Sequence, residues 1–459
     1  MLNLVVQPEI KELIEERKFS ALKEVLIDWS PADIAELFLS LTENEQAILF
    51  RLLPKDLAAD VFEYLDVDSQ MAIIKAIGQG EVAAILNEMS PDDRTALLEE
   101  IPPTAARQII TLLSPKERAI AKTLLGYPEN SVGRLMTPDY IAIKQDWSVQ
   151  QTLDYIRENG ANSETLNVVY VIDDKGVLID DIKIREFLLA KLDARVSDLM
   201  DENFVSLKVN DDQESAVEVF KKYDRIAVPV TDSSGVLIGI VTIDDVIDVA
   251  EEEATEDIHK IAAVEALEEP YSTISLLEMV KKRAGWLSIL FISEMFTASA
   301  MSFFEGEISK AVVLALFVPL IISSGGNSGS QAATLVIRAL SLGEVKLRDW
   351  FFIFKRELMS GLILGLILAV LGFLRISVWQ AAGNVYGLHW ILVAFTVSFS
   401  LIGVVTWGTL MGSMLPLLLK RLGFDPAASS APFVATLVDV TGLVIYFTVA
   451  LLIMRGTLL

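Results

Sequence analysis

The stretch AVVLALFVPLIISSGGNSGSQAATLVIRAL, residues 311–340, decides the fold class. A bilayer takes about 20 consecutive apolar residues to cross as a helix, and the stretch contains such a run. It is one of five apolar runs that follow the basic cluster at residues 281–283, and we predict that each run spans a membrane. The predicted spans are Trp286–Phe304, Ala311–Leu335, Leu358–Trp379, Trp390–Leu419 and Ala431–Met454.

Basic residues between these spans indicate the orientation of the chain. Lys and Arg gather before the first span and in the second and fourth loops, which lie on the same side of the membrane. The positive-inside rule makes that side the cytoplasm. The residues before the first span are then cytoplasmic, and five spans place the C-terminus outside the inner membrane.

Small residues interrupt the second span at Ser323–Gln331, SSGGNSGSQ. Glycines lower the cost of breaking a helix, and broken backbone at membrane depth persists only inside protein or beside water. One interpretation is therefore a permeation path lined by Gly325, Gly326 and Asn327. The other interpretation is a patch of small residues that packs helices together.

Asp439 is a single carboxylate within the apolar fifth span. An ionised carboxylate in hydrocarbon costs at least a few kcal/mol, so we expect it to face a cavity or a partner. Arg375 is a conceivable structural partner, but an ion path is favoured because basic residues are scarce in these spans. Glu294 in the first span is a weaker second candidate. One aspartate per chain would be paired by symmetry, which predicts a homodimer.

Charge divides the chain into two unlike parts. Residues 1–280 carry 25 Lys or Arg and 55 Asp or Glu, a formal charge of −30, whereas residues 281–459 carry +5. Such an acidic region repels nucleic acid and attracts cations. The chain has no Cys and only two His, His259 and His389. Zinc sites of thiolate or imidazole type are thus disfavoured, and oxygen ligands suit Mg²⁺, Ca²⁺ or Mn²⁺.

Two repeats organise the acidic part. From Trp29 onward apolar residues recur every twelve positions, and units such as SPDDRTALLEEI (90–101) begin with Ser-Pro, a cap followed by a first-turn proline. Units this short must stack as a helical superhelix. LMTPDYIAI (135–143) then matches LMDENFVSL (199–207), each opening a strand-helix-strand-strand-helix pattern that resembles the CBS module.

An acidic helix follows the second CBS-like copy. Asp245, Asp248 and Glu252 lie three or four residues apart and share one face, which Glu256 continues. This face is either a solvated surface or a cation sensor. We expect an apolar helix from Ile258 to Val280 to connect it to the first span.

Taken with the string EATEDIHK (253–260), the GGNSGSQAATLVIRAL segment (325–340) and TLVDVTG (436–442), these features resemble the MgtE family of bacterial magnesium channels over essentially the whole chain. The resemblance implies a multidomain fold: an all-α helical-repeat domain, α+β tandem CBS modules, a connecting helix and a five-helix pore. The implied boundaries are 1–130, 131–198, 199–257, 258–283 and 284–459. It also implies a homodimer that conducts Mg²⁺ passively and closes when cytosolic Mg²⁺ accumulates.

Site residues follow from the same resemblance. Asp439 matches the pore carboxylate that recognises hydrated Mg²⁺. The matching regulatory metal ligands are Asp60, Asp92, Asp212, Glu214, Asp224, Asp245, Asp248, Glu253, Glu256, Asp257 and Asp425. A further acid expected after Asp92 is Ala96 here, so one ion is lost or uses Asp93.

Nucleotide binding is a separate expectation, since CBS pairs often bind adenine nucleotides. Thr242 fits a ribose-binding pattern, but the first copy departs from that pattern at Leu178–Asp181, so ATP remains only an optional ligand. Two other functions stay open beside the channel: an ion-coupled or exporting transporter, and a nucleotide-sensing membrane receptor. An enzyme has least support because no nucleophile-base pair is visible.

Overall fold

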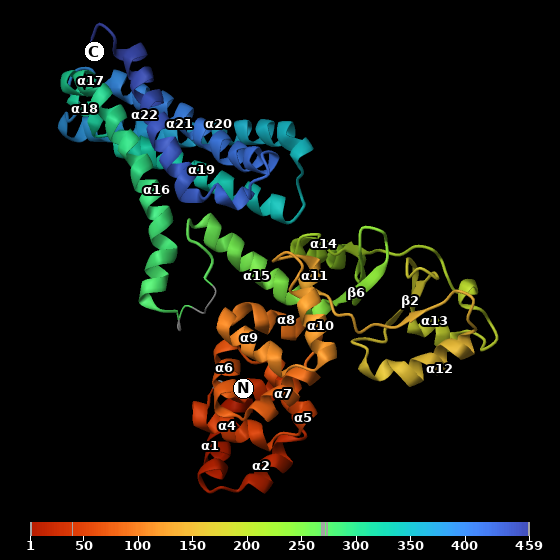
Figure 1. The fold of residues 1–459 in the computed structure, drawn as a ribbon. Coiled ribbons are helices and arrows are strands. Elements are labelled where there is room, and N and C mark those ends of the chain that lie inside the picture. The colour runs from red at the N-terminus through yellow and green to blue at the C-terminus, as the bar shows by residue number, and fades with distance from the viewer. Residues whose placement is uncertain (1, 39, 268–270, 272–273, 458–459) are drawn as a thin grey trace. The chain divides into compact units, whose positions relative to one another are not determined.

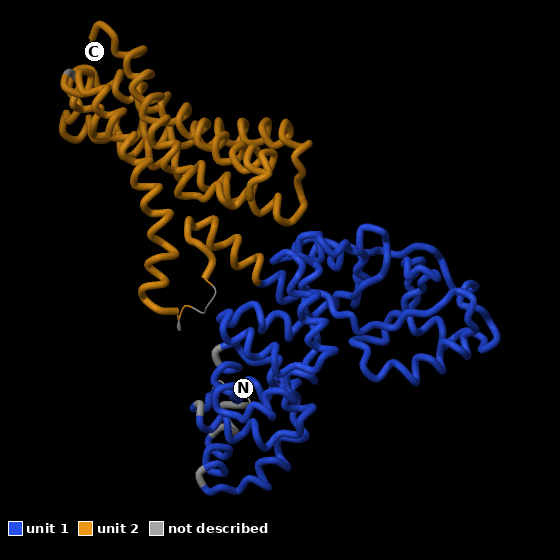
Figure 2. The backbone as a smooth tube through the Cα atoms, viewed as in Figure 1, with its two compact units in different colours: residues 1–251 blue, residues 252–459 orange. Residues whose placement is uncertain are grey.

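We describe the protein from a computed structural model, which covers residues 2–38, 40–267, 271 and 274–457. The chain divides into two compact units, residues 1–251 and 252–459 (Figures 1 and 2). Helix α15, Ile243–Ile261, contains the boundary between them.

The first part of unit 1 is a stack of short helices (Figure 1). Alternate helices pack together, for example α3 on α5 and α5 on α7, so the apolar stripe of each unit is buried by its neighbours. The twelve-residue repeat and the predicted superhelical stack are thereby confirmed. The helices are α1 Leu2–Glu15, α2 Phe19–Leu26, α3 Pro31–Phe38, α4 Glu43–Leu52, α5 Lys55–Glu63, α6 Val67–Ala76, α7 Gln79–Glu88, α8 Pro91–Glu100, α9 Pro103–Leu112, α10 Pro115–Leu124 and α11 Val132–Leu135.

A second period of 24 residues was not predicted from the sequence. Gln46, Gln70, Arg94 and Arg118 each donate a side-chain hydrogen bond to the carbonyl eight residues earlier, at 2.8 to 3.0 Å. Each carbonyl belongs to the last turn of the preceding helix, where backbone acceptors lack partners within the helix. These long polar side chains therefore cap the C-terminal end of every second helix in the stack.

Arg94 illustrates how these side chains contribute to the stability of the helical stack. Its side chain is fully buried, donates to the carbonyls of Leu86 and Met89, and forms an ion pair with Glu117 at 2.5 Å. Removing one partner of a buried pair leaves the other uncompensated, which typically costs about 3 to 5 kcal/mol. We expect Arg94→Met to lower the free energy of unfolding by about that amount.

Urea titration read by pulse proteolysis of the purified full-length protein measures this loss. Arg51→Met is the matched control, because Arg51 also donates to a helix-end carbonyl but its side chain is 50% exposed. Exposed pairs contribute about 1 kcal/mol or less. Equal midpoints for the two variants would contradict the role given to Arg94.

The rest of unit 1 holds two similar small sheets, which confirms the predicted strand-helix-strand-strand-helix order. In each sheet the first strand runs parallel and the third antiparallel to the central one. The first copy comprises β1 Ala142–Ile143, α12 Val149–Asn159, β2 Val168–Ile172, β3 Leu178–Lys183 and α13 Ile184–Leu189; the second comprises β4 Leu207–Lys208, α14 Gln213–Tyr223, β5 Ala227–Thr231, β6 Leu237–Thr242 and α15.

The two copies meet through equivalent turns. The amide of Leu178 donates to the carbonyl of Gly235, and the amide of Leu237 donates to that of Gly176, each at 3.0 Å. Both glycines adopt a positive φ, 81° and 82°, which other residues rarely tolerate. The reciprocal pattern gives the pair an approximate twofold symmetry.

Unit 2 contains five helices long and apolar enough to cross a membrane, as predicted. They are α16 Leu276–Phe303, α19 Val318–Ser341, α20 Trp350–Gly383, α21 Trp390–Arg421 and α22 Ala431–Met454; short helices α17 Glu305–Lys310 and α18 Val312–Ala315 lie between the first two. Helix α21 packs against α19, α20 and α22 and is the most buried of the five.

Two expectations about helix continuity are wrong. The glycine-rich segment does not break its helix, since α19 runs through it, and the interruption lies earlier, between α18 and α19, just before Pro319. A proline fits the first turn of a helix but not its interior.

The continuous helix expected from Ile258 to Val280 is also absent. Helix α15 ends at Ile261, Ala263 takes a left-handed φ of 58°, and the side chain of Ser275 caps a new helix, α16. Residues 268–270 and 272–273 of this predicted connector lie outside the described part of the chain.

Candidate functional site

Asp439 lies half-buried on α22, opposite the glycine-rich part of α19. A Cβ atom at Gly326 would stand 3.4 Å from Asp439 Oδ1 and 3.4 Å from Ala435 Cβ, so a methyl group there would touch the carboxylate and fill the space beside it. Asp439 forms no ion pair or hydrogen bond with the described residues of the chain. A carboxylate without a protein partner in an apolar helix is suited to meet a cation.

The three predicted pore-lining residues take different positions. Gly326 lies next to Asp439, and Asn327 is exposed. Gly325 instead packs between α21 and α22, where an added Cβ would press on Val404 and Val438. Both interpretations of the glycine-rich segment therefore apply: Gly325 allows close helix packing, and Gly326 leaves space beside the carboxylate.

Arg375 does not neutralise Asp439. Its guanidinium lies 3.3 Å from the centre of the Trp379 ring, and its Nη1 is 3.4 Å from Tyr386 Oη. A cation held over an aromatic face has its own electrostatic partner. The structural-partner alternative for Asp439 thus has no support.

In unit 1, four predicted sensor residues converge. Asp92 and Asp93 start α8, and Asp245 and Asp248 lie in the first turns of α15. Burial raises the pKa of Asp92 well above its usual range, and the charge of Asp245 adds to that effect. Burial likewise raises the pKa of Asp245 to about 7, although its carboxylate accepts a hydrogen bond from Thr242 at 2.6 Å.

Two further acids, Glu63 and Glu164, join this group, and sequence reasoning missed them. Glu63 accepts a hydrogen bond from the amide of Ser90 at 2.9 Å, and burial raises its pKa to about 7. Glu164 lies in the loop after α12, where burial and Asp244 raise its pKa. Glu63 follows the predicted Asp60 by one helical turn, which was a usable signal; nothing in the sequence marks Glu164.

These shifts have a definite sign. A carboxylate whose folded pKa exceeds its unfolded pKa contributes most stability at low pH and loses it as the pH rises toward the folded value, here about 7 for Glu63 and Asp245. At neutral pH the group therefore opposes the compact form of unit 1. A bound cation would remove that opposition, and the oxygen donors suit Mg²⁺.

Asp212, Glu214 and Asp224 do not form one site. Asp212 caps the start of α14 and accepts from the amide of Glu214 at 3.0 Å, while Asp224 caps its other end in a left-handed conformation. Eleven helical residues separate these ends by roughly 16 Å. If both ends of α14 bind metal ions, they therefore bind different ions.

In unit 2 a lysine lies between two predicted ligands. Lys260 Nζ is 2.5 Å from Glu256 and 2.7 Å from Asp425. Although partial burial opposes the charged ammonium, hydrogen bonds to these two carboxylates raise the pKa of Lys260. Asp257 instead accepts a hydrogen bond from Ser341 on α19 at 2.8 Å. The end of α15 is thus joined to the membrane helices without a metal.

Across the described residues, no three acidic or histidine side chains converge into a ready-made metal site. Glu253 has a partner of its own, and Asp60 lies on α5, where burial raises its pKa. The predicted regulatory ligands therefore form loose acidic groups rather than a finished coordination shell.

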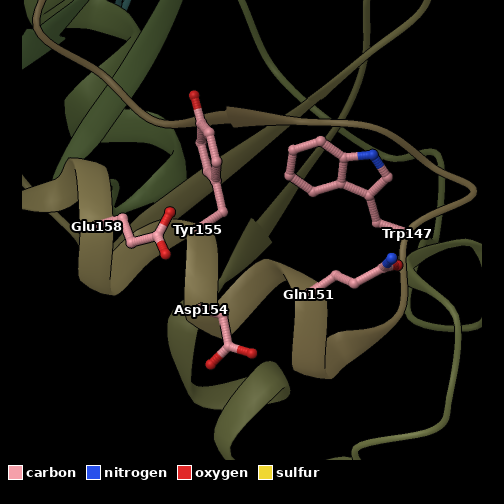
Figure 3. A pocket seen from close by; sticks show the side chains of 5 residues that line it. All are labelled: Trp147, Gln151, Asp154, Tyr155 and Glu158. Carbon is pink, nitrogen blue, oxygen red and sulfur yellow. The ribbon is translucent and has the colours of Figure 1, made fainter.

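A nucleotide site is not evident at Thr242, whose hydroxyl is engaged by Asp245. In the first copy Asp180 is fully buried and accepts from the amides of Asp201 and Glu202. A hollow of about 420 Å³ on α12 is lined by Trp147, Gln151, Asp154, Tyr155 and Glu158. Figure 3 shows these five side chains. Its two carboxylates would repel phosphate groups.

The sequence matches three family models. Residues 318–449 match MgtE, described as a divalent cation transporter, residues 29–130 match the MgtE intracellular N domain, and residues 132–192 and 196–252 match CBS domains.

Named relatives are similar over most of the chain. The magnesium transporter MgtE of Thermus thermophilus is 40% identical over 339 residues, covering 74% of this chain and 73% of the relative. The magnesium transporter MgtE of Enterococcus faecalis is 33% identical, covering 73% and 71%.

Two solved structures resemble the N-terminal part. The cytosolic domain of the Mg²⁺ channel MgtE in complex with ATP is 32% identical with a TM-score of 0.51, over 53% of this chain and 99% of that one. The soluble part of a magnesium transporter is 27% identical with a TM-score of 0.52, over 55% and 99%.

Proposed function

Because this chain belongs to the MgtE family of divalent cation transporters, we propose that it is a Mg²⁺ channel that admits the ion passively and closes when cytosolic Mg²⁺ accumulates. Family membership and five apolar helices make the chain a multi-pass membrane transport protein rather than an enzyme. The passive mode and the closing mechanism are the proposal.

Asp439 is the observation that carries the proposal. It is the one charged residue of α22, it has no cationic partner in the described chain, and Gly326 leaves space beside it. Mg²⁺ gives up its water reluctantly, so a single carboxylate can hold the hydrated ion without a full coordination shell. We propose that two chains pair so that two copies of Asp439 face the same ion.

The membrane potential supplies the driving force. An inside-negative potential contributes about 2.3 kcal/mol per charge per 100 mV, and therefore about twice that for a divalent ion. In the proposed topology the N-terminal unit is cytoplasmic, the C-terminus lies outside the inner membrane, and inward flow needs no hydrolysis. Mg²⁺ flux into proteoliposomes without any other gradient tests this, and strict dependence on a proton or sodium gradient would favour the coupled transporter.

Closure follows from the acidic groups. Like charges around Asp92 and Asp245 repel at neutral pH, and cytosolic Mg²⁺ would neutralise them and draw unit 1 and α15 into a closed arrangement. The solved relative with bound ATP supports a nucleotide as a further ligand of the CBS pair. Calorimetry with ATP tests that, and binding without any Mg²⁺ flux would favour the nucleotide-sensing receptor.

Neutralising the sensor acids is expected to weaken closure while conduction persists. In Asp245→Asn/Asp248→Asn/Glu256→Gln, the Mg²⁺ concentration that halves the current should rise about tenfold, the factor given by about 1.4 kcal/mol of lost differential binding. Patch recordings of reconstituted protein at varied internal Mg²⁺ measure it.

The matched control is Asp174→Asn/Glu186→Gln/Asp193→Asn, which removes the same charge from exposed positions of the first CBS module. Its threshold should stay within about twofold of the original, because exposed charges are screened. An unchanged threshold in the sensor variant would remove these acids from gating.

A further inference from the structure

Glu294 is a second carboxylate at membrane depth. It is the one charged residue between Ala284 and Phe304 of the sequence, ten positions from either end. At 1.5 Å per residue it therefore lies about 15 Å inside this apolar run. Translocon scales assign about 2.5 to 3.5 kcal/mol to an acidic residue at such a depth, so the side chain needs water or a cation.

Helix α16 presents Glu294 to α22. The two helices pack together, and a hollow of about 860 Å³ lies along α16; it is lined mostly by apolar side chains of α16, with Ser288 and Glu294, and by Thr436 of α22. Thr436 precedes Asp439 by three residues, so both lie on neighbouring positions of one helix side. Glu294 is within Coulombic range of Asp439.

The carboxylate of Glu294, which lines this hollow, is not satisfied by the protein. Glu294 is exposed and forms no ion pair or hydrogen bond with any described residue. A carboxylate without a protein partner is a group that a hydrated cation binds through its water.

We infer that Glu294 forms a second station for hydrated Mg²⁺ on the route to Asp439, with the ion held between α16 and α22. This inference rests on the proposed channel function and adds to it a binding group. Two carboxylates within range of each other repel, and a divalent ion between them reverses that repulsion. The station would raise the local concentration of Mg²⁺ beside Asp439 rather than set its maximal flow.

Mg²⁺ flux into proteoliposomes at varied external Mg²⁺ tests the station. In Glu294→Gln the half-saturating Mg²⁺ concentration should rise about fivefold or more, while maximal flux stays within about twofold. Glu294→Asp keeps the charge and should restore most of the affinity. Glu278→Gln, on the same helix but outside the hollow, should leave the half-saturating concentration unchanged.

Block by hexaamminecobalt(III) separates charge attraction from a structural role. This ion resembles a hydrated metal but carries three charges, so Coulombic attraction to Glu294 is larger for it than for Mg²⁺. Glu294→Gln should therefore weaken the block by a greater factor than it weakens Mg²⁺ affinity. If Glu294→Gln acted only by altering the structure, the loss of affinity would not depend on the charge of the ion.

Three results would overturn the inference. They are an unchanged half-saturating concentration in Glu294→Gln, an equal shift in Glu278→Gln, or equal weakening for the divalent and the trivalent ion. If the unmodified protein carries no Mg²⁺, the channel proposal fails and this inference fails with it. If it carries Mg²⁺ and Glu294→Gln is normal, only this inference fails.

Discussion

Replacing Asp439 by Asn is expected to reduce Mg²⁺ flux about 100-fold or more, equivalent to about 2.7 kcal/mol of lost stabilisation for the ion in transit. The amide has nearly the same shape as the carboxylate, so the fit beside Gly326 is kept while the charge is lost. Without that charge, no group on this apolar helix offsets the free energy that the ion loses when it leaves bulk water.

Proteoliposomes that contain a Mg²⁺-sensitive dye measure this flux. Asp349→Asn is the matched control, since Asp349 is a partly exposed acid of the short 3-10 helix before α20 and its neutralisation should leave the flux within about twofold. Equal size-exclusion profiles in detergent would exclude misfolding. Flux near that of the unmodified protein in Asp439→Asn would remove this residue from the ion path.

The membrane part was largely predictable from the sequence, because spans are determined by length and hydropathy and these are local properties. Asp439 was predictable for the same reason: a lone carboxylate in an apolar run requires a function. The order of strands and helices in the CBS copies was also predictable, since each copy repeats the other. The twelve-residue stack followed from its apolar period and its Ser-Pro starts.

Other features depend on contacts between distant residues and were not predictable. Glu63 and Glu164 are 101 positions apart in the sequence, and only the fold brings both to the acidic group around Asp92. Lys260 was not expected between Glu256 and Asp425, because a sequence pattern of acids does not reveal which base will pair with them. The break after Ile261 depends on the left-handed backbone of Ala263, a residue type that gives no such signal.

The continuity of α19 was also not predictable, because it involves contacts with a helix that is distant in the sequence. Its glycines indicate either a broken helix or close packing, and the sequence of one helix does not identify what lies opposite. In the structure Gly325 and Gly329 of α19 face Gly408 and Gly412 of α21, an arrangement of small residues spaced by four on both helices. The glycines lie within an intact helix, and their lack of side chains lets the facing backbone come close enough to pack against it.

Substituting Gly412 is therefore expected to disrupt the membrane unit. A Cβ at this position would collide with the backbone carbonyl of Gly329, and a backbone atom of a packed helix cannot move aside alone. We expect Gly412→Val to cost about 3 kcal/mol or more, at the upper end of overpacking effects. Thermal stability of the detergent-solubilised protein, followed by size-exclusion chromatography, should fall sharply.

Gly306→Val is the matched control for this prediction. Gly306 lies in α17, where an added Cβ would meet no atom within 4 Å, so the same substitution should leave the melting temperature almost unchanged. Because Gly412 is remote in sequence from α19, a fall in the melting temperature would show that the close approach of α19 and α21 stabilises the membrane unit. A monodisperse Gly412→Val protein with an unshifted melting temperature would mean that α19 and α21 do not approach through these glycines.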